Sequence, residues 1–414
     1  MGLLILADDL TGALDSGVQL AKAGIKTLIT YEPSYDILKK ELGVQVLVID
    51  MESRHIPKEL AYRKVYDLAS QAESRGFPLI YKKADSTLRG NIGSELAALL
   101  DATGASRLFF APAYPKLNRT TVNGVQLVDG VPVAETVYAK DPLDPVAESS
   151  LADVIGEQTD IPVVAVSKES LVQLLEDGEN LPHRAIIAID SETDQDLMEV
   201  SRILAANKVS YLAGSAGLSA TLPDFIGVRT LKREYPLSPR RVLVLCGSLN
   251  ACSLKQVQQT SKEGVPLIAL GQEQLQKDYV FSPGGKRFVN RISRIFGTSE
   301  CAILQTGSAP ASFNEYLQIA RWIGQLTAEI IEKAAPDLVV IFGGDTLLGV
   351  SQALPNAVIV PECEILSGVV QSRLSWDGGS VGLVSKAGGF GDPYTLTNIL
   401  RYYGNLPEQE KNIG

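Results

Sequence analysis

The chain has 414 residues, of which 45% are hydrophobic and 21% are charged; this is the composition of a folded globular protein, long enough for about two or three domains, and it excludes intrinsic disorder. A formal net charge of −10 argues against a nucleic-acid partner, because proteins that bind nucleic acids need a basic surface. No apolar run approaches the roughly 20 residues that span a bilayer, and no basic segment precedes the first apolar run, so we expect a cytoplasmic protein without a membrane partner.

The first predicted element is a buried strand that ends in two carboxylates. Leu3 to Ala7 is an apolar run, and Asp8 and Asp9 follow it in a polar turn that opens a helix. Ligands bind at such strand ends in open α/β sheets. Adjacent acids there need a metal ion, a hydroxyl donor or a helix N-terminus to hold them, so we interpret both as site residues. The alternative is that Asp8 caps the helix and Asp9 is solvated.

Strands and helices alternate through the rest of the first half, which predicts a mostly parallel, doubly wound sheet. The predicted strands are Lys26 to Tyr31, Val44 to Ile49, Pro78 to Lys82, Arg107 to Ala111, Ile161 to Val166, Ala185 to Ile189 and Val209 to Ala213. The predicted helices are Lys58 to Arg75, Ile92 to Leu100 and Asp194 to Ala206. An exception is Thr120 to Tyr138, where Asp129-Gly130 separates two apolar runs and predicts a β-hairpin. Such a hairpin could serve as a lid or as the arm of a homodimer.

A dense polar set follows the strand at Pro78 to Lys82. It contains Lys83, Asp85, Ser86 and Arg89, which together suit a small, oxygen-rich ligand, because Arg can clamp a carboxylate and Asp can accept hydroxyl hydrogens. The alternative is a capping turn, with Asp85 or Ser86 as the N-cap and a solvated Arg89. Further polar clusters at 50–55 and 118–121 also follow strands, so we expect these strand ends to converge on one cleft.

A linker is predicted at Arg229 to Arg241, which carries two prolines and five basic residues. A second series of strand signals follows it, at Arg241 to Leu245, Pro266 to Leu270, Ala302 to Gln305, Asp337 to Phe342, Ala357 to Val360 and Val381 to Ser385. The sequence therefore predicts two α/β domains, residues 1–230 and 241–414.

Three strands of the second domain run into turns that suit a phosphate. The turns contain Gly343-Gly344-Asp345-Thr346, Gly388-Gly389, and Ser248 with Asn250. Glycines allow a ligand close to the backbone, and the free N–H groups of a turn and a helix start bind phosphate oxygens. Their recurrence in one domain indicates a nucleotide, although a single glycine turn is most often simple turn chemistry. The chain has neither a Walker phosphate loop nor the dinucleotide fingerprint, which disfavours a nicotinamide cofactor.

Cysteines and histidines give no metal site. Cys246, Cys252, Cys301 and Cys363 lack paired ligand spacing, and they suggest no disulfide framework. The histidines, His55 and His183, lie in no recognisable nucleophile or ligand motif. The metal ligands therefore stay unknown at this point, and Asp8 is expected either to orient Asp9 or to bind a metal ion through water.

The chain resembles the four-carbon acid sugar kinase family over nearly its whole length. The resemblance rests on an ordered set of motifs: Ala7 to Ala13, Glu52-Ser53-Arg54, Lys83 to Gly90, Pro112-Ala113-Tyr114-Pro115, Gly124 to Glu135, Gly214 to Leu218, Gly343 to Thr346 and Gly388 to Gly391. It implies that residues 1–230 bind an acid sugar and that residues 241–414 bind ATP. The implied reaction transfers the γ-phosphoryl group to the terminal (C4) hydroxyl of a tetronate such as threonate, erythronate or 3-oxo-tetronate.

The resemblance also suggests roles for individual residues. Ser248, Asn250, Gly343 to Thr346, Gly388 and Gly389 are expected to bind the nucleotide, while Asp8, Thr11, Arg54, Lys83, Ser86 and Arg89 are expected to bind the acid sugar. Mg²⁺ is expected to bridge the ATP phosphates. Asp9 or Asp85 is expected to orient or deprotonate the attacking hydroxyl, with Asp9 preferred, and Arg54 and Arg89 to hold the carboxylate.

Two other functions remain open at this point. One is a non-catalytic sensor of sugar acids or nucleotides, which would lack magnesium-dependent turnover. The other is a dehydrogenase or aldolase acting on the same acids, which is disfavoured because the chain lacks a dinucleotide fingerprint and a Schiff-base context for any lysine.

Overall fold

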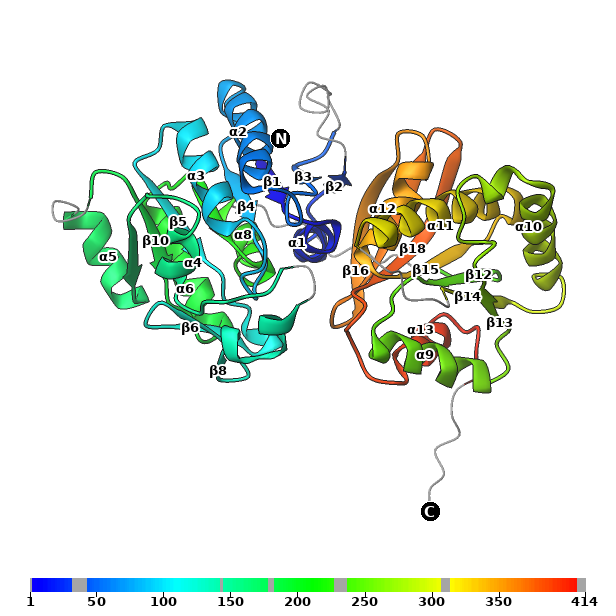
Figure 1. The fold of residues 1–414 in the computed structure, drawn as a ribbon. Helices are drawn as coiled ribbons and strands as arrows, with labels where there is room; N and C mark the ends of the chain where they lie inside the picture. The colour runs from blue at the N-terminus through cyan, green and yellow to red at the C-terminus, as the bar shows by residue number, and fades with distance from the viewer. Residues whose placement is uncertain are drawn as a thin grey trace, which may run out of the picture. The chain divides into compact units, whose positions relative to one another are not determined.

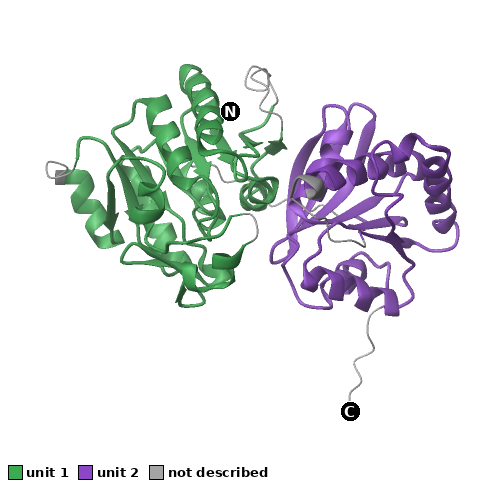
Figure 2. Cartoon of the chain, in the orientation of Figure 1, with its two compact units in different colours: residues 1–233 green, residues 234–414 purple. Residues whose placement is uncertain are grey.

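The computed structural model describes residues 2–31, 43–141, 144–177, 182–226, 237–306 and 313–407 (Figure 1). The chain divides into unit 1, residues 1–233, and unit 2, residues 234–414 (Figure 2). Most of the predicted linker, residues 229–236, lies outside the described residues. Within the described part, no helix is long and apolar enough to cross a membrane.

Unit 1 is built on a parallel sheet in which the first strand, β1 (Leu3–Ala7), is an interior strand. Its strand order is β2 (Thr27–Thr30), β3 (Val46–Asp50), β1, β4 (Ile80–Lys83), β11 (Tyr211–Gly214), β5 (Arg107–Ala111), β10 (Ala185–Ile189) and β9 (Val163–Val166). Every residue of β1 is fully buried, as expected for a strand covered on both faces. Ala7 pairs with Asp50 on one side and with Lys83 on the other. The segments after β1, β3 and β4 therefore begin side by side.

The helices of unit 1 cover this sheet. They are α1 (Leu10–Lys22), α2 (Lys58–Ser74), α3 (Ile92–Thr103), α4 (Leu151–Gly156), α5 (Lys168–Asp177), α6 (Asp194–Ala206), α7 (Ala216–Ser219) and α8 (Leu222–Phe225). In α2 the apolar positions at helical spacing are the buried ones, among them Val65, Leu68 and Ala72. A capping box between Thr193 and Asp196 fixes the start of α6. All three predicted helices of this region are confirmed.

The predicted hairpin is confirmed as part of a three-stranded antiparallel sheet. It consists of β6 (Arg119–Val122), β7 (Val125–Val128) and β8 (Val131–Pro132) and continues into the short 3₁₀ helices η3 (Val133–Glu135) and η4 (Val137–Lys140). Asp129 and Gly130 both have positive φ, as the tight hairpin turn requires. The sequence analysis missed a second turn of the same kind, Asn123-Gly124, which joins β6 to β7.

Unit 2 contains a mixed sheet in the order β13 (Leu267–Leu270), β14 (Cys301–Thr306), β12 (Val242–Cys246), β15 (Leu338–Phe342), β18 (Gly379–Lys386), β17 (Val369–Trp376) and β16 (Val358–Leu366). The first five strands are parallel to one another, while β17 is antiparallel to both β18 and β16. The sequence analysis missed β17 and the last six residues of β16. The turn at Asp377, Gly378 and Gly379 was the signal that could have identified this meander.

The helices of unit 2 lie on both faces of its sheet. They are α9 (Ala251–Lys262), α10 (Pro283–Ile295), α11 (Phe313–Ala334), α12 (Gly344–Ala353) and α13 (Thr395–Tyr402). Figure 1 shows α9 and α13 on one face, and α11 and α12 on the other. The core against α13 joins Val244, Phe342 and Val384 to Leu396 and Ile399. The α/β class with mostly parallel sheets is therefore confirmed.

Candidate functional site

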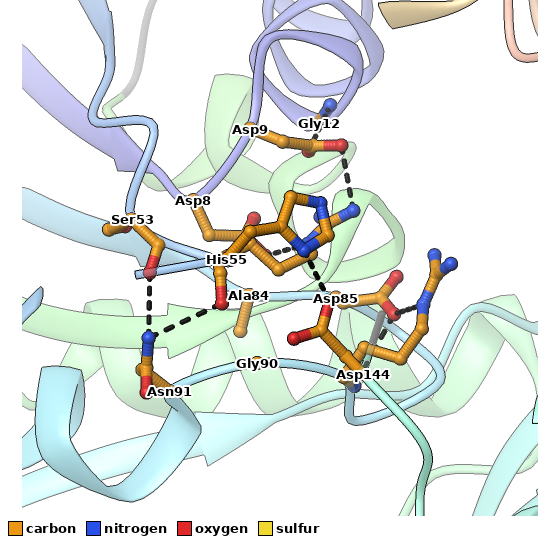
Figure 3. A network of polar contacts seen from close by, with 12 residues as sticks. Asp8, Asp9, Gly12, Ser53, His55, Ala84, Asp85, Gly90, Asn91 and Asp144 are labelled. Carbon is orange, nitrogen blue, oxygen red and sulfur yellow. Dashed lines mark hydrogen bonds and ion pairs between the residues drawn. The ribbon is translucent and has the colours of Figure 1, made fainter. Parts of the chain in front are cut away.

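Asp8 and Asp9 lie directly after β1, and the structure gives them different surroundings (Figure 3). Asp9 is the N-cap of α1, and its Oδ1 accepts the N–H of Gly12 at 2.8 Å. Asp8 is buried, with 2% exposure. The Arg54 guanidinium joins the two acids, since its Nε lies 2.7 Å from Asp8 Oδ2 and its Nη1 lies 2.7 Å from Asp9 Oδ2. The capping alternative is thus wrong in its assignment, because Asp9 caps the helix and Asp8 does not.

Asp8 is held in its ionised form. Burial by itself raises the pKa of Asp8, but the positive charges of Arg54, Lys83 and Lys82 outweigh it and lower that pKa below its usual value. Lys83 Nζ lies 3.9 Å from Asp8 Oδ1. A Cβ at Gly12 would lie 2.7 Å from both Lys83 Nζ and Asp9 Oδ1. Glycine at this position therefore lets the lysine and the carboxylate approach the start of α1.

Asp85 lies at the centre of a second ion-pair group, after β4. Its Oδ2 accepts the Nε–H of Arg89 at 2.7 Å and the hydroxyl of Thr87 at 2.5 Å, and Arg89 Nη1 lies 3.2 Å from Asp141 Oδ2. Burial acts to raise the pKa of Asp85, but Arg89 and Arg54 hold it well below its usual range. The N-cap of α3 is Asn91, so neither Asp85 nor Ser86 caps that helix, and the capping alternative does not hold here.

A buried network fixes the segment that carries Arg54. Asn91 Nδ2 donates to the carbonyl oxygens of Ser53 at 2.7 Å and of Ile56 at 2.8 Å. The Ser53 hydroxyl donates to Glu95, which also pairs with the fully buried Lys82 at 2.9 Å. Arg54 is thereby held from α3 and β4, and its orientation does not depend on the two aspartates alone.

We expect Gly90→Ala to disturb this arrangement. Gly90 has a φ of +88°, and a Cβ there would lie 2.7 Å from Arg54 Cγ and 3.2 Å from Arg54 O. Strained backbone costs about 1–3 kcal/mol, and the collision with Arg54 adds to that cost. Gly104→Ala is the matched control, since Gly104 has a φ of +66° and nothing within 4 Å of its Cβ position. Denaturant unfolding should show a larger loss in the free energy of unfolding for Gly90→Ala than for Gly104→Ala. Equal losses in the two variants would show that the packing of Gly90 against Arg54 contributes nothing.

The hairpin region supplies two further residues that the sequence analysis did not place among the site residues, Arg119 and Tyr138. Arg119 Nη1 donates to Ser86 Oγ at 2.6 Å, and its Nη2 donates to the Tyr138 hydroxyl at 3.0 Å. The guanidinium carbons of Arg89 and Arg119 lie 5.5 and 5.7 Å from the centre of the Tyr138 ring. The only sequence signal for these residues was the polar cluster at 118–121, which gave no indication of its partners.

Arg54 and Arg89 also line a polar cavity of about 310 Å³. His55 and Asp144, whose side chains contact each other, contribute to the same wall (Figure 3). Thr11, the remaining predicted residue of this region, lies half-buried in the first turn of α1. Unit 1 thus brings together the predicted residues Asp8, Asp9, Arg54, Lys83, Asp85, Ser86 and Arg89, whereas no contact in the described structure links the Thr11 side chain to them.

In unit 2 the three glycine turns meet at the carboxyl ends of the adjacent strands β12, β15 and β18. A Cβ at Gly388 would lie 2.2 Å from Ser248 Oγ, and a Cβ at Gly343 would lie 3.3 Å from Thr346 Oγ1 and 3.8 Å from Ser248 N. Gly343, with a φ of +108°, is the N-cap of α12 and provides no side-chain cap for its N–H groups. Gly344 and Asp345 form the first turn of that helix.

Asn250 completes this second group. Its side chain caps α9 by accepting the Cys252 N–H at 2.9 Å, and its Nδ2 lies 3.4 Å from the Cβ position of Gly389. All eight residues predicted for the nucleotide are therefore neighbours in space. Uncapped N–H groups at a helix start, beside glycines that admit close approach, can bind an anion such as a phosphate.

Lys386, which the sequence analysis did not assign, holds the glycine loop after β18. Its Nζ donates to the carbonyl oxygens of Ala387 and Phe390, both at 2.8 Å. Two side chains of α9 act in the same way, since Ser253 Oγ donates to Gly388 O at 2.5 Å and Gln256 Nε2 to Phe390 O at 2.9 Å. Burial lowers the pKa of Lys386 to about 8. Because these donors all bind carbonyl oxygens, they fix the loop without using its N–H groups.

Two family models match the chain. A sugar-binding N-terminal domain matches residues 3–222, and a nucleotide-binding C-terminal domain matches residues 243–396. These matches fall on the units that carry the two groups of residues described above. The first therefore covers the aspartate and arginine groups, and the second covers the glycine turns.

Curated relatives and a solved structure extend the similarity over the full chain. The D-threonate kinase of Salmonella typhimurium is 30% identical over 97% of this chain and 98% of its own length. The D-erythronate kinase of Heliobacterium modesticaldum is 31% identical over 61% of this chain and 59% of its own length. A solved protein of Salmonella typhimurium LT2 superposes with a TM-score of 0.79 at 21% identity, covering 97% of this chain and 99% of that protein; it supports the fold alone.

Proposed function

The chain belongs to the four-carbon acid sugar kinase family, and we propose that it transfers the γ-phosphoryl group of ATP to the terminal (C4) hydroxyl of a four-carbon acid sugar such as threonate, erythronate or 3-oxo-tetronate. The observation that carries this proposal is the similarity to a D-threonate kinase over 97% of the chain. The expected kinase is thereby favoured over a dehydrogenase, an aldolase or a non-catalytic sensor.

Asp9 is our candidate for the residue that receives the hydroxyl proton. Its carboxylate is fixed by the Gly12 N–H and by Arg54, and its side chain keeps 23% exposure, so a hydroxyl can reach it. Asp85 is less suited to this step, because Arg89 and Arg54 hold its pKa well below the usual range and leave it little affinity for a proton. We propose that Asp85 positions the acid sugar, and that Asp8 holds Arg54.

Unit 2 suits the ATP phosphates. The Gly388 position is a cradle that a Cβ would fill, since that atom would meet Ser248 Oγ at 2.2 Å, and the adjacent start of α12 lacks a side-chain cap. Phosphoryl transfer requires positioning and neutralisation of charge more than covalent chemistry. The backbone N–H groups of these turns supply both without a cluster of basic side chains.

Mg²⁺ is proposed as the companion of the nucleotide. Among the described residues, no group of three or more His, Cys, Asp or Glu could hold a metal ion. Mg²⁺ usually keeps several waters and binds through substrate phosphates with one or two carboxylates. When bound, the ion would neutralise phosphate charge; we assign no protein ligand to it.

A coupled assay for ADP release tests the function. Wild-type protein is incubated with ATP, Mg²⁺ and, in turn, D-threonate, L-threonate, D-erythronate and 3-oxo-tetronate. We expect ADP release with at least one acid and none when Mg²⁺ is chelated. Absence of release with every acid, combined with calorimetric binding of an acid or of ATP, would favour the sensor.

We propose that the protein acts in the cytoplasm and that it can form a homodimer. The use of ATP is consistent with the cytoplasm, and the hairpin region at 119–140 is the candidate arm of a homodimer. Sedimentation of the wild-type chain and of a variant lacking the tip of this region would test the second point, since a monomer in both cases would contradict it.

A further inference from the structure

We propose that Arg119 is the residue that binds the carboxylate of the acid sugar, in place of Arg54 and Arg89. The inference rests on the proposed function and deepens it, because it fixes which end of the acid lies where. Three arginines surround Asp85 in unit 1, and they differ in one respect: whether a protein carboxylate already neutralises them.

Arg54 and Arg89 are each paired with two aspartates. Arg54 contacts Asp8 and Asp9 through Nε and Nη1, both at 2.7 Å, and Arg54 is itself buried, with 7% exposure. Arg89 contacts Asp85 at 2.7 Å and Asp141 at 3.2 Å. To clamp a substrate carboxylate bidentately, either arginine would have to give up contacts with its own aspartates. Leaving a buried carboxylate without its partner is costly.

Arg119 has no such partner. Among the described residues no carboxylate forms an ion pair with it, and its two terminal nitrogens donate instead to the neutral hydroxyls of Ser86 and Tyr138. Its Nε is buried and has no hydrogen-bond acceptor in the described structure. A guanidinium offers five N–H donors, so Arg119 keeps unused donors and a charge that no carboxylate pairs with directly in the described structure. These are the properties that a carboxylate-binding residue needs.

Arg119 is held in position by the protein before the acid sugar binds. It is the first residue of β6, and its backbone pairs with Tyr114 through hydrogen bonds of 2.7 and 3.2 Å. Its guanidinium is oriented by Ser86 Oγ at 2.6 Å and by the Tyr138 hydroxyl at 3.0 Å. Binding therefore loses little side-chain entropy at this residue. Ser86 and Tyr138 acquire a role as residues that position Arg119.

The same geometry gives the acid sugar a direction. Arg119 donates to Ser86, the residue next to Asp85, at 2.6 Å, and the charges of Arg54 and Arg119 both act to lower the pKa of Asp85, so Asp85 lies near both arginines. With its carboxylate on Arg119, the acid would extend past Asp85 toward Asp9. Its far end, the terminal hydroxyl, is the group that the proposed reaction phosphorylates. Recognition of a carboxylate at one end and catalysis at the other predicts that the site prefers an acid to a neutral polyol.

The test compares an acid with a molecule that lacks the carboxylate. Binding of the preferred tetronate and of threitol, the four-carbon polyol, is measured by calorimetry for wild type, Arg119→Gln and Arg119→Lys, together with kcat and KM for the acid. Arg119→Gln should weaken acid binding by about 10- to 100-fold, the loss of charged hydrogen bonds, and should leave threitol binding unchanged. Arg119→Lys keeps the charge but loses the planar fork, so its affinity for the acid should lie between those of wild type and Arg119→Gln.

Lys116→Gln serves as the control, because Lys116 is an exposed lysine three residues before Arg119. Thermal unfolding establishes that each variant is folded. Unchanged acid affinity in folded Arg119→Gln overturns the inference, and so does an equal loss for the acid and for threitol. Failure of the proposed function gives a different result, namely no ADP release by the wild type with any acid.

Discussion

Asp9→Asn lowers kcat for the acid sugar by about 10²- to 10⁴-fold, the range typical of a lost general base, and leaves the KM for ATP within about twofold. The reason is local. Asp9 presents one carboxylate oxygen to Gly12 N–H and the other to Arg54, and it is the aspartate at the end of β1 that retains exposure. Steady-state ADP release at varied acid and varied ATP measures both constants.

Asp9→Asn removes the proton-accepting carboxylate but leaves the helix cap, because Asn is as good an N-cap as Asp and preserves the start of α1. Asp160→Asn, at an exposed position, is the control for the loss of one negative charge. Wild-type turnover in Asp9→Asn, with unchanged affinity for the acid, would show that Asp9 is not the base. Asp85 would then be the next candidate despite its lowered pKa.

Gly388→Ala is the second substitution for which a large effect is expected. The added Cβ would lie 2.2 Å from Ser248 Oγ and 3.0 Å from Ser248 Cβ, a separation that forces either the loop or the serine to move. Lys386, Ser253 and Gln256 hold this loop by its carbonyl oxygens, so the loop cannot yield without losing those hydrogen bonds. We expect the KM for ATP to rise at least about tenfold, since a well-placed hydrogen bond to a charged group contributes about 1.5–3 kcal/mol.

Calorimetry with ATP and with the acid separates the two binding sites. Affinity for the acid should stay at its wild-type value in Gly388→Ala, because the acid is proposed to bind unit 1. Gly156→Ala provides a control alanine, as nothing lies within 4 Å of its Cβ position. If Gly388→Ala binds ATP with wild-type affinity, Gly388 is not part of the nucleotide site.

Short patterns in the sequence determined the framework of this protein. A five-residue apolar run is long enough for a buried strand, and the acids or glycines that follow it must lie at the sheet edge where ligands bind; Asp8, Asp9, Gly343 and Gly388 were found in this way. Asp-Gly between apolar runs identified the hairpin, because few residues tolerate positive φ at both turn positions. These signals are local, so a single sequence reveals them.

Only the tertiary structure decided which charges meet. Arg54 reaches Asp8 across 46 positions in the sequence, Arg89 reaches Asp141 across 52, and Arg119 reaches Ser86 across 33. Periodicity carries no information about such distances, because strand order and register set them. For that reason the sequence analysis gave the carboxylate to Arg54 and Arg89, whereas among the three arginines that act on Asp85 the described structure gives carboxylate partners to Arg54 and Arg89 and none to Arg119.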